Sequence, residues 1–219
     1  MPLIDLEAFR AAPLTRDPFN FTIVRQAIRT ADAADIRTDF PAIADSGLLP
    51  VEATRPGPRF SQLIEELQSE EVARAFSEKF DVDLVGRAQM ITVRGRCSLR
   101  DGRIHTDTES KLITVLIYFN EPWEAKGGRL RLLRSPTDLN DMIGEVPPDA
   151  GTMIAFRRSD RSYHGHEPFE GVRRYVMINW MTSGFAAQRE LFRHRLSARV
   201  KQAASLLKPA AQPAEGAHG

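Results

Sequence analysis

The five histidines of this chain are unevenly placed, and three of them stand where they could bind a metal. His105 comes two residues before Asp107, and His164 and His166 follow about sixty residues later. Side chains two residues apart in an extended segment point to the same face, so His105 and Asp107 can converge on one ion. The His164 segment can supply a third ligand from a neighbouring strand. We therefore expect a metal held by His105, Asp107 and a histidine of this later segment, His164 or His166.

Two imidazoles and one carboxylate form the ligand set of non-haem Fe(II) oxygenases, which leaves metal positions open. Two open positions suit the keto oxygen and C1 carboxylate of 2-oxoglutarate, and a third suits O2. The far carboxylate of 2-oxoglutarate needs a cation, and a guanidinium can bind it through two parallel hydrogen bonds. Arg173 and Arg174 stand about ten residues past His164. H-x-D alone occurs by chance in many proteins, whereas this combination beside predicted strands is far more specific.

The segments before these residues are expected to be mostly helical. Ser69 can cap a helix that has two glutamates in its first turn, where they favour the positive end of the helix dipole. Val72, Phe76 and Phe80 recur every fourth residue of that helix, as a stripe that packs against a sheet does. Other candidate helices cover residues 3–12, 21–34 and 61–67, and the prolines of residues 40–60 indicate a loop.

Short strands without intervening helices follow, and this pattern favours an antiparallel barrel or sandwich. Residues 112–119 are almost continuously apolar and indicate a buried central strand. Further strands are expected at residues 90–93, 130–133, 152–156 and 175–181. A helix is expected over residues 185–207, and the small, proline-bearing residues 208–219 are expected to be disordered.

The composition is that of an ordinary globular protein and excludes several classes. With 219 residues the chain suits one domain, and its net charge of +1 gives no general attraction to nucleic acid or anionic membranes. Its one cysteine, Cys97, cannot form a disulfide within the chain, which fits a cytoplasmic location. The N-terminal residues do not read as a signal peptide, and no apolar run is long enough to span a bilayer.

The chain resembles the prolyl-hydroxylase branch of the 2-oxoglutarate/Fe(II) oxygenases over residues 84–182. The resemblance includes H105-T-D107, VLIYFNEPW, GGRLRL, PPDAGTMIAF, SYHGHEP and RRYVMINW. In that family a proline follows the distal histidine by four residues, as Pro168 follows His164. The family's basic residue precedes a tryptophan by six, as Arg174 precedes Trp180. The resemblance thus selects His164 over His166 and Arg174 over Arg173, and it places Tyr118 beside 2-oxoglutarate.

The resemblance implies a mainly β fold with flanking helices around a double-stranded β-helix, or jelly-roll, core. We expect an N-terminal helical region over residues 1–83, the core over 84–183, a C-terminal helix over 184–207 and a tail over 208–219. The implied activity is hydroxylation of a C–H bond with succinate and CO2 as products. The implied cofactors are Fe(2+), 2-oxoglutarate and O2, with ascorbate as a candidate supporting reductant. Asp107 favours hydroxylation over halogenation, because a halogenase leaves that ligand position open.

Other polar residues near the expected site allow two interpretations. His166, Trp180, Lys111 and Arg103 are candidates for contacts around the metal or at the substrate rim, although a tryptophan in this position is more often a core residue and His166 is more often a solvent-exposed neighbour. Arg103 and Lys111, with Arg157, Arg158 and Arg161, would suit an anionic substrate if they converged and a solvated rim if they did not.

The substrate and the oligomeric state are left open by the sequence. Peptidyl proline, a free amino acid and a sugar are all compatible with the pattern, because the flexible loop that covers peptides in the hypoxia-factor enzymes has no recognisable counterpart here. Two other classes are a cupin-like metal-binding or sensor module without oxygenase turnover, and a zinc hydrolase with the same triad. A hydrolase would have no need for Arg174.

Overall fold

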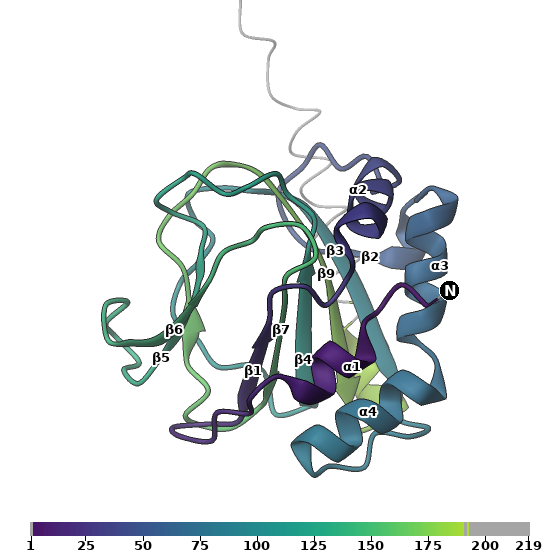
Figure 1. Ribbon diagram of the computed structural model, residues 1–219. Helices are drawn as coiled ribbons and strands as arrows, with labels where there is room; N and C mark the ends of the chain where they lie inside the picture. Colours follow the sequence, from purple (N-terminus) through teal and green to yellow (C-terminus); the bar gives the residue numbers. More distant parts are fainter. Residues whose placement is uncertain (1, 191, 193–219) are drawn as a thin grey trace, which may run out of the picture.

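The computed structural model describes residues 2–190 and 192 of the chain (Figure 1). Four α-helices and a short 3-10 helix lie in the N-terminal part, and most strands follow them. The helices are α1 (Leu6–Ala11), α2 (Thr30–Thr38), η1 (Val51–Ala53), α3 (Pro58–Leu67) and α4 (Glu70–Phe80). The strands are β1 (Phe21–Val24), β2 (Leu49–Pro50), β3 (Gln89–Cys97), β4 (Lys111–Tyr118), β5 (Leu130–Leu133), β6 (Met142–Val146), β7 (Met153–Arg157), β8 (His164–Gly165) and β9 (Gly171–Met181).

The strands form two sheets whose neighbours pair antiparallel. The large sheet has the order β1-β7-β4-β9-β3-β2, and the small sheet has the order β6-β5-β8. One cluster of buried side chains contains residues from both sheets, including Leu116, Leu132 and Met177, so the sheets pack face to face. Within the described residues they form an open jelly-roll sandwich and not a closed barrel, as Figure 1 shows. The expected mainly β, jelly-roll core is confirmed.

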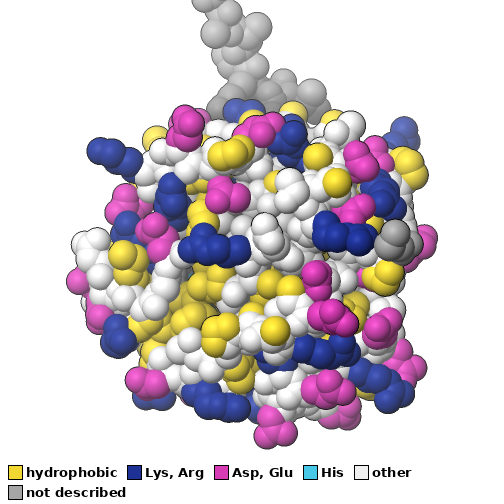
Figure 2. All heavy atoms as spheres, viewed as in Figure 1, with side chains coloured by type: hydrophobic (Ala, Val, Ile, Leu, Met, Phe, Trp, Pro, Cys, Tyr) yellow, Lys and Arg dark blue, Asp and Glu magenta, His cyan; other side chains and the backbone are white. Residues whose placement is uncertain are grey.

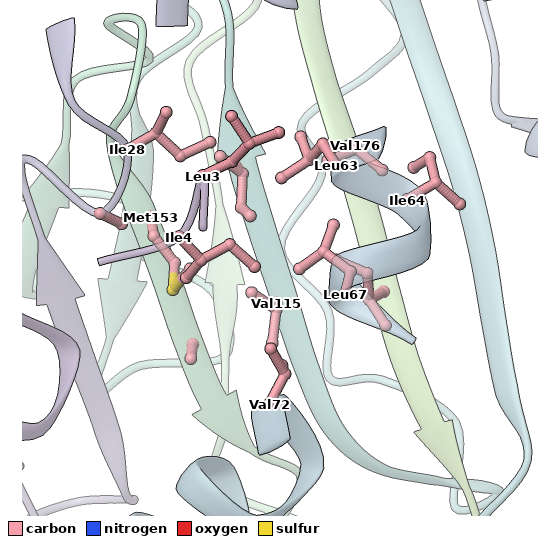
Figure 3. Close-up of a cluster of buried hydrophobic side chains, with 14 of the residues drawn as sticks. Leu3, Ile4, Ile28, Leu63, Ile64, Leu67, Val72, Val115, Met153 and Val176 are labelled. Carbon is pink, nitrogen blue, oxygen red and sulfur yellow. The ribbon is translucent and has the colours of Figure 1, made fainter. Parts of the chain in front are cut away.

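The helices cover the other face of the large sheet (Figure 1). Helix α3 buries Phe60, Leu63, Ile64 and Leu67 along one side, so that apolar side faces the sheet. Figure 3 shows Leu63 and Leu67 of this helix close to side chains of the central strands, such as Val176. The large sheet is therefore buried on both faces, with the helices on one side and the small sheet on the other.

Strand β9 illustrates how this burial divides the side chains. Val176, Ile178 and Trp180 belong to the cluster beneath the helices, whereas Tyr175 and Met177 belong to the cluster between the sheets. The alternation follows from the two-residue period of a strand. Odd-numbered residues of β9 thus face the interior of the sandwich, and even-numbered residues face the helices.

The helix expected over residues 21–34 is wrong. Phe21–Val24 forms β1 and pairs with β7 at the edge of the large sheet, and only Thr30–Thr38 is helical. The sequence FTIV has the β-branched and aromatic residues that strands favour, and pairing with a distant strand overrides the local helical pattern. The strands β6 and β8 were not expected, and β3 and β9 extend beyond the expected residues.

Other expectations for single elements are confirmed. Helix α4 begins after Ser69, whose hydroxyl accepts a hydrogen bond from the Val72 N–H, and the strand expected at residues 130–133 is β5. Helix α3 begins three residues earlier than expected because Pro58 suits the first helical turn. Residues 184–190 are helical, and most of the expected C-terminal helix and the whole tail lie outside the described residues.

In the part of the chain that the structure describes, no helix has the length and apolarity needed to cross a bilayer. The face in Figure 2 shows basic and acidic side chains interspersed over the helices, in keeping with the small net charge.

Phe76 is central to the packing of helices on the sheet. Its ring stacks on Phe9 at 4.1 Å between centroids and lies 5.0 Å from the Trp180 ring. We expect Phe76→Ala to lower the free energy of unfolding by about 3–5 kcal/mol, because it leaves a cavity in a close-packed core. Urea unfolding monitored by circular dichroism measures this change.

Phe185→Ala is the matched control, since that phenylalanine is 76% exposed. It should change the free energy of unfolding by no more than about 0.5 kcal/mol. Equal effects of the two substitutions would contradict the described packing.

Candidate functional site: a metal centre and an adjoining cationic cavity

The segments that carry His105 and His164 are joined by two backbone hydrogen bonds. The His105 N–H donates to the His164 carbonyl at 3.1 Å, and the His164 N–H donates to the His105 carbonyl at 3.0 Å. The imidazole centroids consequently lie 4.3 Å apart. Two ligands distant in sequence are thus fixed side by side by the main chain.

Each of the two imidazoles forms its hydrogen bond through Nδ1, which leaves Nε2 free to bind a metal. His105 Nδ1 lies 2.9 Å from the Arg103 carbonyl, and His164 Nδ1 lies 2.9 Å from the Ser162 carbonyl. Because a carbonyl only accepts, each Nδ1 carries the proton and each Nε2 keeps its lone pair. Burial lowers the pKa of His164 to about 4, against the opposing attraction of Asp107. His164 is therefore neutral near pH 7, as a metal ligand must be.

Asp107 is buried and held by two side chains. Lys111 Nζ lies 2.7 Å from Oδ1, and the Thr114 hydroxyl donates to Oδ2 at 2.5 Å. Burial alone would raise the pKa of Asp107, but the charge of Lys111, the electrostatic interaction with the His164 imidazole and the hydrogen bonds from Lys111 and Thr114 outweigh it and lower the pKa to about 2. The carboxylate is therefore charged at neutral pH and available to a cation.

Behind Thr114 the hydrogen-bond chain continues to a buried amide. Asn179 Nδ2 donates to Thr114 Oγ1 at 2.8 Å, so the Thr114 hydroxyl proton is directed to Asp107. Thr114 and Asn179 face each other across β4 and β9 on the interior side of the sheet. This pair, which the sequence did not reveal as functional, orients the carboxylate from behind.

His105, Asp107 and His164 together have the donors that a divalent metal requires. One candidate ligand atom from each lies within 4.8 Å of the others. Two neutral imidazoles and one carboxylate suit Fe(II). The expected triad is thus brought together, with His105 exposed and the other two residues buried.

The triad lies at a cavity of about 290 Å³ between the two sheets. Leu116, Leu130 and Met177 provide apolar walls, while Arg173 and Tyr175 lie on the β9 side. This volume lies just below the usual range for small-molecule sites, roughly 300–1,000 Å³.

Arg173 reaches this cavity and is almost fully buried, with 2% of its surface exposed. Its Nε donates to the Gly128 carbonyl at 2.7 Å, and one terminal nitrogen donates to the Tyr118 hydroxyl at 3.3 Å. Its guanidinium also lies over the rings of Tyr118 and Tyr175. Among the described residues no carboxylate pairs with this cation.

Arg174, which the sequence favoured over Arg173, points the other way. Its guanidinium lies 6.0 Å from the centroid of the Phe40 ring and borders surface hollows that contain Arg37 and Glu121. The reason is the two-residue period of β9, because Arg174 shares its face with Trp180 on the helix side. The structure therefore places Arg173, and not Arg174, in the cavity of the triad.

The other candidate site residues also separate into those that line the cavity and those that do not. Lys111, Arg103 and His166 line the cavity, whereas Trp180 is buried beneath the helices and makes no contact with it. Burial and the charge of Arg173 lower the pKa of His166 to about 4, so this imidazole is neutral. The other cations suggested by the sequence, Arg157, Arg158 and Arg161, do not line the cavity.

Several cavity residues were not singled out from the sequence, and Arg94 is one of them. Arg94 lines the cavity from β3, and its guanidinium pairs with Asp101 at 2.7 Å. It lies over the Tyr175 ring from the neighbouring strand, opposite Tyr175 in the register. The signal that could have revealed it is again the alternation along the strand, since buried Thr92 lies on the same face.

The comparisons with known proteins agree with this geometry. Residues 97–182 match the family model of the 2OG-Fe(II) oxygenase superfamily, a segment that contains the triad, Tyr118 and Arg173. A search of curated protein sequences found no match.

Solved structures show the same fold at low sequence identity. A prolyl-4-hydroxylase from Pseudomonas putida aligns with a TM-score of 0.55 and 15% identity, covering 75% of this chain and 94% of its own. The viral collagen prolyl hydroxylase of Paramecium bursaria Chlorella virus-1, in a 2-oxoglutarate complex, aligns with a TM-score of 0.52 and 14% identity, covering 74% and 95%. HygX from Streptomyces hygroscopicus, with nickel and 2-oxoglutarate bound, aligns with a TM-score of 0.50 and 13% identity, covering 79% and 88%.

Residues 97–182 thus carry the match to the 2OG-Fe(II) oxygenase superfamily, and the chain has the fold of the prolyl 4-hydroxylases. The match supports a 2-oxoglutarate-dependent dioxygenase as the enzyme class.

Thr114 offers a test of the metal centre that leaves the three candidate ligands intact. We expect Thr114→Val to weaken Fe(II) binding by roughly 10- to 100-fold, because the carboxylate loses the donor that orients it. Anaerobic titration with Fe(II), followed by calorimetry, measures the dissociation constant.

Thr92→Val is the control, since this buried threonine has a hydroxyl without a hydrogen-bond partner in the described structure. It should bind Fe(II) as the unmodified protein does. If Thr114→Val also binds normally, the hydrogen-bond chain does not position Asp107.

Proposed function

We propose that this protein hydroxylates a C–H bond of its substrate, with Fe(II) held by His105, Asp107 and His164 and with 2-oxoglutarate anchored by Arg173 and Tyr118. The observation that carries the proposal is the buried Arg173 guanidinium, which has no carboxylate partner among the described residues and lies in the cavity of the triad. This cation implies that the site is completed by an anionic ligand.

The electrostatic argument rests on the cost of burying a lone charge. Removing an ion from water costs several kcal/mol unless an opposite charge and hydrogen bonds replace the water. Gly128 and Tyr118 each accept one N–H of Arg173, which leaves further N–H groups without a described acceptor. A carboxylate can accept two of them in parallel.

Tyr118 supports the same interpretation. Burial raises the pKa of its phenol to about 12, so the hydroxyl keeps its proton at neutral pH. Its oxygen already accepts a hydrogen bond from Arg173, and its own proton is therefore free to be donated. Arg173 and Tyr118 together offer a cation and a neutral donor to one carboxylate, as the far end of 2-oxoglutarate requires.

The remaining residues provide orientation and a dry cavity. When bound, iron, 2-oxoglutarate and O2 supply the oxidation of the C–H bond, with succinate and CO2 as the accompanying products. Thr114 and Lys111 hold Asp107, the carbonyls behind both histidines hold the imidazoles, and Leu116 and Met177 exclude water from one wall.

A ligating carboxylate at position 107 supports hydroxylation over halogenation. Peptidyl proline, a free amino acid and a sugar remain the candidate substrates.

Substitution of the two adjacent arginines of β9 tests which of them anchors 2-oxoglutarate. Arg173 would do so on the interior face of the sheet, and Arg174 on the helix face. We expect Arg173→Gln to raise the KM for 2-oxoglutarate by roughly thirtyfold or more, because the buried carboxylate would lose its cation. Succinate formation at varied 2-oxoglutarate concentration measures the effect. Arg174→Gln is the matched control and should stay within about twofold; the reverse result would move the anchor to Arg174.

A binding or sensor module with the same fold makes a different prediction for turnover. We expect the unmodified protein to form succinate from 2-oxoglutarate and to show the weak visible absorption of an Fe(II)–2-oxoglutarate complex without oxygen. Asp107→Ala should lose both signals, because the metal loses its anionic ligand. Asp160→Ala, at an exposed aspartate outside the cavity, should keep both. Absorption without any succinate would favour the binding module.

A further inference from the structure

The lining of the described cavity carries more positive charge than binding of the proposed cofactors would neutralise. Five cationic side chains line it, namely Arg94, Arg100, Arg103, Lys111 and Arg173, against two carboxylates, Asp101 and Asp107. Lys111 pairs with Asp107 and Arg94 pairs with Asp101, each at 2.7 Å. Arg173 is assigned to 2-oxoglutarate by the proposed function. Arg100 and Arg103 remain, and neither side chain has a described ion pair.

The segment that carries these two arginines is held firmly by its own contacts. We name residues 98–104 the rim loop, since they border the cavity and lead directly to His105. Asp101 accepts a hydrogen bond from the Ser98 N–H at 2.8 Å and also pairs with Arg94. The Gly102 carbonyl accepts a hydrogen bond from the His166 N–H at 2.9 Å. The loop is thus tied to β3 through Asp101 and to the His166 segment through Gly102.

Gly102 adds a steric restraint to these hydrogen bonds. Its φ is +92°, a conformation that suits glycine, and a Cβ at this position would lie 2.5 Å from His166 Nδ1. The loop therefore packs against the His166 segment without space for a side chain. Arg100 and Arg103, on either side of this contact, are exposed but start from a fixed backbone.

We propose that the primary substrate carries a carboxylate or equivalent anionic group, which Arg100 and Arg103 bind at the mouth of the cavity; this inference rests on the proposed function. Fe(II) and the dianion of 2-oxoglutarate cancel each other, so cosubstrate binding does not remove the excess positive charge. Clefts lined by one sign of charge concentrate ligands of the opposite sign. A guanidinium binds a carboxylate with two directed hydrogen bonds, whereas a neutral peptidyl proline offers no charge to either arginine.

The test compares probes that differ at one group, which is either an anionic carboxylate or an uncharged carboxamide. The Fe(II) protein with saturating 2-oxoglutarate is mixed with free L-amino acids and small hydroxy acids, each matched with its neutral carboxamide, and succinate formation in air is measured. We expect at least one acid to stimulate succinate formation with a KM about tenfold or more below that of its carboxamide, the difference that hydrogen bonds to a charged group provide.

Variants of the rim loop connect this preference to the two arginines. Arg100→Gln with Arg103→Gln should bring the ratio of the two KM values close to one, and Arg100→Lys with Arg103→Lys should keep most of the preference because the charge stays. Arg161→Gln, at an exposed arginine outside the cavity, is the control and should match the unmodified protein.

Three outcomes overturn the inference: carboxamides act as well as acids, no acid stimulates succinate formation, or the preference survives the double glutamine variant. The Fe(II)–2-oxoglutarate absorption separates this failure from failure of the proposed function. If the absorption forms but charge preference is absent, the anionic substrate alone is wrong. If the absorption never forms, the proposed function is wrong and this inference falls with it.

Discussion

Two hydrogen bonds between the backbones of His105 and His164 fix the place where every other feature of the site meets. They join a loop ahead of β4 to the short strand β8, so that two imidazoles from distant parts of the chain lie together. Asp107 follows two residues later and meets Thr114 of β4, while Arg103 two residues earlier faces the cavity mouth. A main-chain contact of this kind is insensitive to most side-chain changes. The candidate metal centre therefore depends on the register of two segments more than on any single packing contact.

The second constraint is the double burial of the large sheet. Each of its central strands must satisfy an apolar core under the helices and a polar cavity on the other face, with alternate residues serving each side. In β9, Trp180 and Arg174 face the helices, whereas their sequence neighbours Asn179 and Arg173 face the interior of the sandwich. A slip of one residue in pairing would exchange the two sets and remove the cation from the cavity. The long, well-paired contact between β9 and its neighbours is what prevents such a slip.

The sequence was informative where pattern and local structure coincide. The H-x-D pair, the later histidine, the capped helix after Ser69 and the apolar strand of residues 112–119 could all be recognised, since each depends on neighbouring residues. The sequence favoured Arg174, whereas the structure has Arg173 lining the cavity. Both faces of β9 are buried, so hydrophobicity alone does not tell which of the two arginines faces the cavity. Trp180 lies beneath the helices, and Arg174, six residues earlier, shares its face.

The short edge strands β1 and β8 were not predicted from the sequence, for a related reason. Phe21–Val24 becomes a strand through its pairing with β7, and the two-residue strand β8 exists through its contact with β5. Neither segment has enough residues for a periodic pattern to identify it. Whether such a segment forms a strand depends on its pairing with residues far along the chain, and the sequence does not show this pairing.

The gradient of exposure across the cavity has a consequence for binding. Arg173 is buried at the inner end, whereas His105, Arg100 and Arg103 are exposed at the mouth. Under the proposed function, 2-oxoglutarate at Arg173 and a substrate at Arg100 and Arg103 would share one cavity of about 290 Å³. Two ligands that share so small a space contact each other, so each is expected to change the affinity of the protein for the other.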